Sequence, residues 1–420
     1  MQTNDFEHKM NVYADLAINV GLNLQKGQRL LIRGPLMYGA PISAAPLALA
    51  LARSAYRAGA RLVDIFWGDE QTELYRFQLG PKDALEEVSK WKADAPFEHV
   101  KNGDAVISIS GVNPDLFKGQ DPELVSKYTN AIWTKLDPFL KITSNNQVNW
   151  LVISAPTPGW SAKVFPDLPP AEREAKMWET IFKLCRLDQP DPIAAWKTHV
   201  HNLEARADHL NAKKFSSFHY TGPGTDLTVG FPEGAIWCAA SEKTSKGIPF
   251  IANLPTEEVF TLPHKDKVDG VIHSALPLNY SGSVIDDFAL RFEGGKVVNS
   301  SAKVGEVVLQ KMLATDEGAC RLGEVAIVPY SSPISQSGLL FYNTLLDENA
   351  ACHLAFGNAY QTTLKGGGSL SDAEFKAFGG NVSLIHVDFM VGSNKMDIDG
   401  ILPDGRSEPV LRSGDWAFNV

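Results

Sequence analysis

The clearest chemical pattern in the chain is a histidine and an aspartate two residues apart, inside the apolar segment 382–391. Side chains of a strand alternate between its faces, so His386 and Asp388 are expected to point the same way. Burying an imidazole beside a carboxylate is costly unless a partner compensates both, and a divalent cation is the simplest such partner. A hydrogen bond between the two side chains, or an exposed strand end, is the alternative interpretation.

Two further segments offer residue types that bind metal ions. Glu324 opens the apolar segment 323–329, and glutamate is rarely buried without a partner. His353 stands among small apolar residues, with Tyr360 seven positions later, and a Gly-Asn pair between them favours a strand and loop over a helix. An exposed strand start for Glu324 and a hydrogen-bonded core histidine for His353 are the ordinary alternatives.

A pair of adjacent glutamates, Glu257 and Glu258, lies between Pro255 and Pro263. In an extended chain only one of two neighbouring side chains can face a given site. We therefore expect the pair to divide its roles, one as a metal ligand and the other as a group that orients a ligand or transfers a proton. A solvated turn is the alternative.

Other chemistries find no support in the sequence. It contains no G-x-S-x-G nucleophile motif, no phosphate-binding G-x-x-x-x-G-K-[ST] loop, and no G-x-G-x-x-G after a strand. Its four cysteines lack C-x-x-C spacing, which argues against a disulfide framework and a thiolate zinc site and suits a reducing compartment. They are Cys185, Cys238, Cys320 and Cys352.

Composition narrows the class of protein further. The 420 residues are 44% hydrophobic and 21% charged, which is typical of a globular enzyme, and the formal net charge of −10 disfavours nucleic acid and anionic membranes as partners. The uncharged stretch 34–52 contains three prolines and is not expected to span a membrane. The first ten residues mix both charge signs and do not resemble a signal peptide. A cytoplasmic enzyme is therefore expected.

The order of elements indicates how these residues are positioned. In the first half, short apolar strands at 29–33, 61–66, 105–110 and 150–154 alternate with helices at 46–58, 122–136 and 171–187, a pattern typical of βαβ units. Asp-Gln-Pro-Asp-Pro at 188–192 interrupts this pattern, and a helix at 193–212 is expected to bridge two domains. Later strands are punctuated by Gly, Pro and Asn, as in antiparallel hairpins. We predict an α/β fold, with a largely parallel sheet in domain 1–190 and an α+β metal-binding catalytic domain at 191–420.

Taken together, the segments resemble the thermophilic-type metallo-aminopeptidases, the group that includes aminopeptidase T and aminopeptidase S. The resemblance covers nearly the whole chain and is most specific in the C-terminal half. The matching segments are 253–261, 323–326, 337–345, 347–350, 352–355, Tyr360 and 386–388.

The resemblance implies a homodimer that releases N-terminal amino acids from peptides with a free N-terminus. It also implies two divalent ions per chain, drawn from zinc, cobalt, manganese and magnesium, which activate a water molecule. The implied ligands are Glu258, Glu324, His353, Tyr360, His386 and Asp388, with Glu324 as the bridge.

Two implied roles stay open at this point. Tyr360 is either a ligand or a hydrogen-bond donor to the developing oxyanion. Glu257 is the expected general base, and it is also the alternative to Glu258 as the ligand of the glutamate pair. Two competing functions are a mononuclear iron ring-cleaving dioxygenase of related architecture and a non-catalytic binder of metal or peptide.

Overall fold

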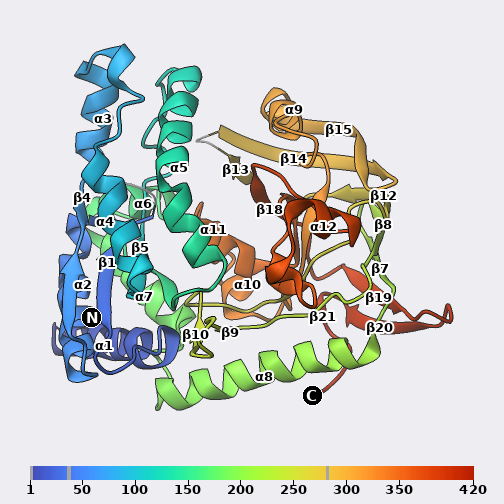
Figure 1. Ribbon diagram of the computed structural model, residues 1–420, viewed down its shortest axis with the longest axis horizontal. Helices are drawn as coiled ribbons and strands as arrows, with labels where there is room; N and C mark the ends of the chain where they lie inside the picture. The colour runs from blue at the N-terminus through green and yellow to red at the C-terminus, as the bar shows by residue number, and fades with distance from the viewer. Residues whose placement is uncertain (1–2, 36–38, 281–282) are drawn as a thin grey trace. The chain divides into compact units, whose positions relative to one another are not determined.

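The computed structural model describes residues 3–35, 39–280 and 283–420 (Figure 1). The chain divides into two compact units. The first comprises Met1–His199 and Ser241–Pro255, and the second comprises Val200–Ala240 and Thr256–Val420. The first unit is therefore built from two separate stretches of sequence.

A four-stranded parallel sheet with the order β3-β1-β5-β6 forms the centre of the first unit. Its inner strands are almost wholly buried, as parallel strands covered by helices usually are. The topology confirms the expected parallel sheet. The strands are β1 (Arg29–Arg33), β3 (Leu62–Ile65), β5 (Ala105–Ser110) and β6 (Trp150–Ser154).

Helices precede, connect and follow these strands along the chain, and the connecting ones supply the crossovers that parallel pairing requires. They are α1 (Thr3–Leu16), α2 (Ala45–Arg57), α3 (Glu70–Leu79), α4 (Lys90–Lys101), α5 (Pro122–Ser144), α6 (Pro158–Val164) and α7 (Pro170–Leu184), with single turns at Ala17–Gly21, Ile42–Ala44 and Lys82–Ala84. Short strands form two small additional ladders: β2 (Ala40–Pro41) with β4 (Trp67–Gly68), and β9 (Ser241–Lys243) with β10 (Pro249–Ile251).

Two features of these helices differ from the sequence expectation. Helix α5 continues to Ser144 instead of ending near residue 136, although Pro138 lies inside it. Leu136 and Phe139 are both buried, so packing on either side of the proline compensates for the lost backbone hydrogen bond. Helices α3 and α4 have no counterpart among the expected elements, because their sequences are largely polar and show no clear apolar stripe.

Helix α8 (Pro192–Lys213) corresponds to the expected bridging helix, and the division between the units falls within it, after His199. Among the described residues no helix is long and apolar enough to cross a membrane. Residues 36–38 of the uncharged stretch 34–52 lie outside the described residues, and most of the remainder forms α2 and the turn before it.

The second unit contains a nine-stranded antiparallel sheet with the order β13-β14-β12-β8-β7-β19-β20-β21, and β15 pairs with β14. The run 289–298 that looks strand-like in sequence is the turn end of the β14–β15 hairpin, and α9 lies beside this hairpin (Figure 1). The bounds are β7 (Ser217–Gly222), β8 (Thr225–Gly230), β12 (Val268–His273), β13 (Leu278–Tyr280), β14 (Ser283–Glu293), β15 (Lys296–Val304), β19 (Asp397–Ile401), β20 (Ser407–Arg412), β21 (Asp415–Trp416) and α9 (Glu306–Leu313).

A second, smaller antiparallel sheet of this unit has the order β11-β16-β17-β18. The two sheets contribute buried side chains to one hydrophobic core. The strands of the smaller sheet are β11 (Val259–Thr261), β16 (Leu322–Ile327), β17 (His353–Gly357) and β18 (His386–Met390). The remaining helices are α10 (Pro333–Ser337), α11 (Thr344–Asp347) and α12 (Asp372–Ala377), with 3-10 turns at Glu348–Ala350, Gln361–Thr363 and Gly367–Ser369.

Candidate metal centre

One face of the smaller sheet carries most of the chemically active residues. Glu324 of β16 pairs with Ala355 of β17, which pairs with Asp388 of β18, so the three side chains form a row across one face. His353 and His386 each lie two residues from a member of this row and therefore share that face. Because Ala355 is small, space remains between the two carboxylates on either side of it.

Strand β11 adds one glutamate to the same face. Phe260 pairs with Ala326, which lies two residues after Glu324, so Phe260 is on the ligand face. Glu258 precedes Phe260 by two residues and has the same parity, whereas Glu257 has the opposite parity. The expectation that the two glutamates point in different directions agrees with this arrangement.

The opposite face of the sheet is packed into the core. Val325, Leu354, Phe356 and Phe389 are almost fully buried there, and the rings of Phe356 and Phe389 stack with centroids 4.3 Å apart. A one-residue slip of any strand would exchange the ligand face with the core face. The hydrophobic pattern thus fixes the register that brings the ligands together.

Two glycines shape the strands beside the ligands. The β16–β17 ladder shifts register between Leu322 and Glu324, and a Cβ at the intervening Gly323 would lie 2.4 Å from the carbonyl oxygen of Gly357. Gly357 itself has a φ of +91°, and a Cβ there would lie 2.1 Å from the carbonyl oxygen of Ile385. Only glycine fits these two positions without moving the strands.

Five of the residues expected from sequence converge into two groups that share Glu324. Glu258, Glu324 and His353 form one group, and Glu324, His386 and Asp388 form the other. Within each group the ligand atoms lie within 4.8 Å of one another. His353 Nε2 lies 3.2 Å from Glu258 Oε2 and 3.5 Å from Glu324 Oε1, and His386 Nε2 lies 3.2 Å from Asp388 Oδ1 and 3.7 Å from Glu324 Oε2.

Backbone carbonyl groups set the orientation of both imidazoles. His353 Nδ1 lies 3.2 Å from the carbonyl oxygen of Ala351, and His386 Nδ1 lies 2.7 Å from that of Asn358. A carbonyl oxygen can only accept, so each Nδ1 carries the proton and donates it. Each Nε2 then faces the carboxylates and is the atom available as a metal ligand.

Without a cation, the charges at this site are poorly balanced. Burial alone would lower the pKa of His353, but the carboxylates of Glu258 and Glu324 raise this pKa well above its ordinary value. Burial also opposes the charged form of His386, yet Asp388 and Glu324 raise its pKa to about 9. Burial raises the pKa of Glu324, in spite of both histidines. The site therefore favours added positive charge.

Two carboxylate oxygens are buried without a hydrogen bond from the described residues, namely Glu258 Oε2 and Asp388 Oδ1. Each lies only 3.2 Å from an imidazole nitrogen, yet neither has a hydrogen-bond partner among the described residues. Oxygens of this kind, beside imidazole nitrogens, are the donor set that divalent cations such as zinc take. The residues present thus fit a metal ion.

Sequence reasoning missed one acidic residue at this site, Glu348. It is 9% exposed, and burial raises its pKa well above the ordinary value, with further contributions from Glu258 and Asp388. The signal was available, because Asp347, Glu348 and Asn349 form a polar triplet between apolar residues. All three are buried, which is unusual for adjacent polar side chains.

The neighbours of Glu348 hold the surrounding loops. Asn349 Oδ1 accepts a hydrogen bond of 2.7 Å from the backbone N–H of Glu257, and Asn349 Nδ2 donates to the carbonyl oxygen of Leu345. Asp347 accepts from the backbone N–H groups of Phe341 and Asn343, at 2.7 and 2.8 Å. These bonds connect the segment before His353 with the glutamate pair.

The two remaining sequence candidates lie at the edge of the site. Glu257 is 3% exposed but belongs to neither ligand group among the described residues. Tyr360 is 38% exposed, and its ring lies 4.9 Å from the ring of His386 and 6.5 Å from that of Phe260. Its ring thus borders the ligands from the solvent side.

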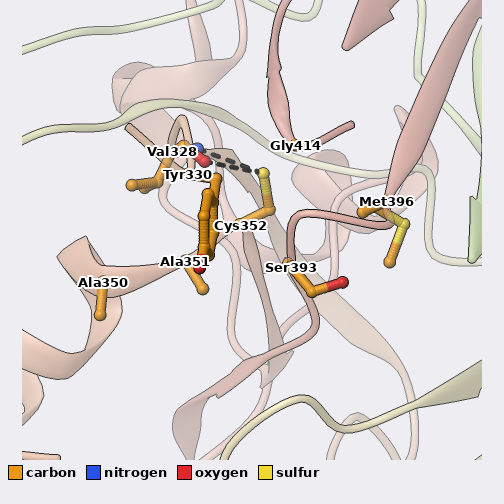
Figure 2. Close-up of a pocket in the computed structure, with 9 residues that line it drawn as sticks. Val328, Tyr330, Ala350, Ala351, Cys352, Ser393, Met396 and Gly414 are labelled. Atoms are coloured by element: carbon orange, nitrogen blue, oxygen red, sulfur yellow. Dashed lines mark hydrogen bonds between the residues drawn. The ribbon is translucent and has the colours of Figure 1, made fainter. Parts of the chain in front are cut away.

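Cys352, which precedes His353, belongs to a separate small pocket between Val328, Tyr330 and Met396 (Figure 2). Its thiol donates to the carbonyl oxygen of Val328 at 3.1 Å and accepts from the N–H of the same residue at 3.4 Å. It lines a small cavity of about 10 Å³ with Tyr330 and Met396. Burial raises the pKa of this thiol to about 11, so it is a neutral group that joins the end of β16 to the start of β17.

Carboxylates and imidazoles converging on a rigid sheet define the site of a metal-dependent hydrolase. Comparison with known proteins gives the family: the chain matches the thermophilic metalloprotease family (M29) over residues 6–416 and belongs to it.

Full-length relatives agree with this assignment. The chain is 45% identical over 417 residues to aminopeptidase 2 of Geobacillus stearothermophilus, covering 99% of this chain and 100% of the relative. It is 43% identical over 415 residues to aminopeptidase AmpS of Bacillus subtilis, with the same coverage. The solved structure of wild-type AmpT from Thermus thermophilus superimposes with a TM-score of 0.92 at 41% identity, covering 98% of this chain and 100% of that one. The expected family, fold class and metallo-aminopeptidase function are confirmed.

Proposed function

We propose that the protein releases N-terminal amino acids from peptides by means of two divalent cations that share Glu324. Glu258, Glu324 and His353 would hold one cation, and Glu324, His386 and Asp388 the other. The observation that carries this proposal is the overlap of the two ligand groups at a single buried glutamate. Zinc, cobalt, manganese and magnesium are all compatible with oxygen and nitrogen donors of this kind.

When bound, paired cations make a water molecule a stronger acid and stabilise negative charge on the oxygen of a scissile carbonyl. The protein's own residues then supply orientation and proton transfer. The carbonyl oxygens of Ala351 and Asn358 keep each imidazole Nε2 turned toward the site, so no reorientation is needed during turnover.

Three residues around the ligands have proposed roles in the reaction. Glu257, buried next to the ligand glutamate, accepts a proton from the attacking water as general base. Tyr360, beside His386, either completes the ligand set or donates a hydrogen bond to the developing oxyanion. Glu348 adds a carboxylate that either binds a cation or attracts the α-ammonium group of a peptide with a free N-terminus.

Two further proposals concern the protein as a whole. A homodimer follows from the family resemblance alone. A cytoplasmic location is supported by the four cysteines, none of which forms a disulfide bond among the described residues.

Substitution of the shared glutamate tests the proposal. We expect the wild-type protein to contain about two ions per chain by elemental analysis and to hydrolyse Leu-p-nitroanilide. Glu324→Gln keeps the shape but removes the charge that both groups use, so both metals and at least about 100-fold of kcat/KM should be lost. Glu317→Gln, an exposed neutral substitution nearby in sequence, is the matched control.

The same measurements distinguish the competing functions. A folded Glu324→Gln protein with normal turnover would contradict the proposal. Ferrous iron at one ion per chain, with oxygen uptake, would indicate a dioxygenase instead. Metal at full occupancy without turnover of any peptide would indicate a non-catalytic binder.

A further inference from the structure

A buried arginine of the first unit has no ionic partner among the described residues. Arg33, the last residue of β1, is only 2% exposed. No carboxylate lies within ion-pair distance of it in the part of the chain that the structure describes, and its Nε is buried without an acceptor there. The guanidinium carbon lies over the ring of Phe139, 4.6 Å from its centroid. Arginine is rarely this buried unless it is paired.

The position of Arg33 in the sheet is one where ligands commonly bind. Open sheets of parallel strands bind ligands beyond the carboxyl ends of their strands, and Arg33 is at the carboxyl end of an inner strand. It has the parity of Leu31, which packs in the same hydrophobic cluster as Phe139. The guanidinium group thus lies on the face of the sheet that packs against α5, next to the apolar side chains of Leu31 and Phe139.

Hydroxyl groups share this face of the sheet. Arg33 pairs with Ser108 on the neighbouring strand β5, so the two side chains point the same way, and Ser110 follows with the same parity. Ser154, which pairs with Ser110, has a fully buried hydroxyl without a hydrogen-bond partner among the residues described. The edge is therefore rich in donors and, at Arg33, positively charged.

A second arginine on the same strand differs from Arg33 in having ionic partners, although its Nε also lacks a hydrogen bond among the described residues. Arg29, at the amino end of β1, lies 3.4 Å from carboxylate oxygens of both Asp64 and Asp104. Burial lowers the pKa of Arg33 to about 10, so it still carries its charge at neutral pH. A buried charge of this kind is costly until an anion compensates it, and a guanidinium fork matches a carboxylate or phosphate by two parallel hydrogen bonds.

We propose that Arg33, with the hydroxyl of Ser108 beside it, binds a small oxyanion, a carboxylate or a phosphate, at the carboxyl edge of the parallel sheet. The proposal does not depend on the metal centre, because all of its residues belong to the first unit.

Anion binding to the full-length protein tests this site. Wild type, Arg33→Gln and Arg29→Gln are titrated at pH 7 with inorganic phosphate and, separately, with sodium acetate, at constant ionic strength made up with chloride. Binding is followed by calorimetry and by the unfolding temperature. We expect one of the two anions to bind wild type and Arg29→Gln with similar affinity and to bind Arg33→Gln at least about tenfold more weakly. If only phosphate or only acetate binds, that result identifies which oxyanion the site takes.

Further variants keep the test decisive if Arg33→Gln does not fold. Arg33→Lys keeps the charge but loses the fork, and Ser108→Ala removes one donor, so both should weaken binding by about three- to tenfold. Phosphate or acetate that binds to metal ions at the candidate metal centre would still bind in every Arg33 variant, which distinguishes that binding from binding at Arg33. Equal affinities of wild type and the Arg33 variants, or no response of wild type to either anion up to about 10 mM, would overturn the proposal.

Discussion

At the scale of single residues, the candidate metal centre depends on which atom of each side chain faces the others. The two imidazoles donate their Nδ1 protons to backbone carbonyls, which leaves both Nε2 atoms for the carboxylates. The adjacent glutamates differ in a similar way, because Glu258 belongs to a ligand group and Glu257 belongs to neither group among the described residues. One position in sequence therefore separates the proposed metal ligand from the proposed general base.

Neutral substitutions of the two glutamates should separate these functions. Glu258→Gln removes a ligand charge, and we expect the protein to lose roughly half of its bound metal and most of its activity. Glu257→Gln should retain both metals and lose about 100-fold in kcat with little change in KM, because a general base contributes about 10²–10⁴-fold. Metal analysis and steady-state kinetics of both variants provide the measurement. Loss of metal in Glu257→Gln with full occupancy in Glu258→Gln would reverse the assignment.

At the scale of elements, a four-stranded antiparallel sheet with unlike faces positions the ligands. One face is part of the hydrophobic core and the other bears the carboxylates and histidines, separated by the small side chains of Ala326 and Ala355. Glycines at the β16–β17 ladder allow the strands to approach closely where the ligands converge. The geometry of the site is thus a property of strand register and not of flexible loops.

Substitution of Gly357 should disturb the site through the backbone alone. At a φ of +91°, Gly357→Ala is strained and brings a methyl group against the carbonyl of Ile385. We expect a stability loss of about 1–3 kcal/mol and weaker metal binding, because the next carbonyl, of Asn358, orients His386. Urea unfolding and metal titration measure the two effects. Gly368→Ala, where a Cβ meets no atom within 4 Å, is the control, and equal behaviour of the two variants would refute this explanation.

The sequence predicted some of these features better than others. His386 and Asp388 could be predicted to share a face because they lie two residues apart in an apolar strand. The parallel sheet could be predicted from the alternation of strands and helices. Glu348 was missed because its neighbours in space, Glu258 and Asp388, are remote in sequence and no local periodicity links them. Helices α3 and α4 were missed because their sequences are largely polar and show no clear apolar stripe.

At the scale of the whole molecule, metal binding and folding should be coupled. The second unit buries several acidic groups whose charges the two histidines only partly compensate when no cation is present. A cation that binds the folded state alone stabilises that state by mass action. Removal of metal should therefore lower the unfolding temperature as well as abolish activity.

The pH dependence of stability should differ between the metal-free and metal-loaded protein. In the metal-free protein Asp388 and Glu324 outweigh the effect of burial and raise the pKa of His386 from 6.5 to about 9. Its charged form therefore stabilises the folded state fully below pH 6.5, and this contribution is lost as the pH rises through about 9. We expect a loss on the order of 1–3 kcal/mol over this window.

Unfolding of the protein in chelator and after metal reconstitution, at several pH values between these limits, measures the effect. The metal-loaded protein should not show the loss, because a ligand imidazole is already neutral. His386→Gln should reduce the slope in chelator. Identical slopes with and without metal would contradict this account.

The first unit is built from two separate stretches of sequence, which limits how the protein can be divided into fragments. The chain crosses from one unit to the other after residues 199, 240 and 255, and the middle excursion supplies strands β9 and β10. A fragment that stops at residue 199 would lack those strands, and a fragment that starts at residue 200 would carry them without the rest of their unit. Split-protein or truncation experiments would therefore have to transplant residues 241–255 onto the amino-terminal fragment, because no single cut yields two self-sufficient halves.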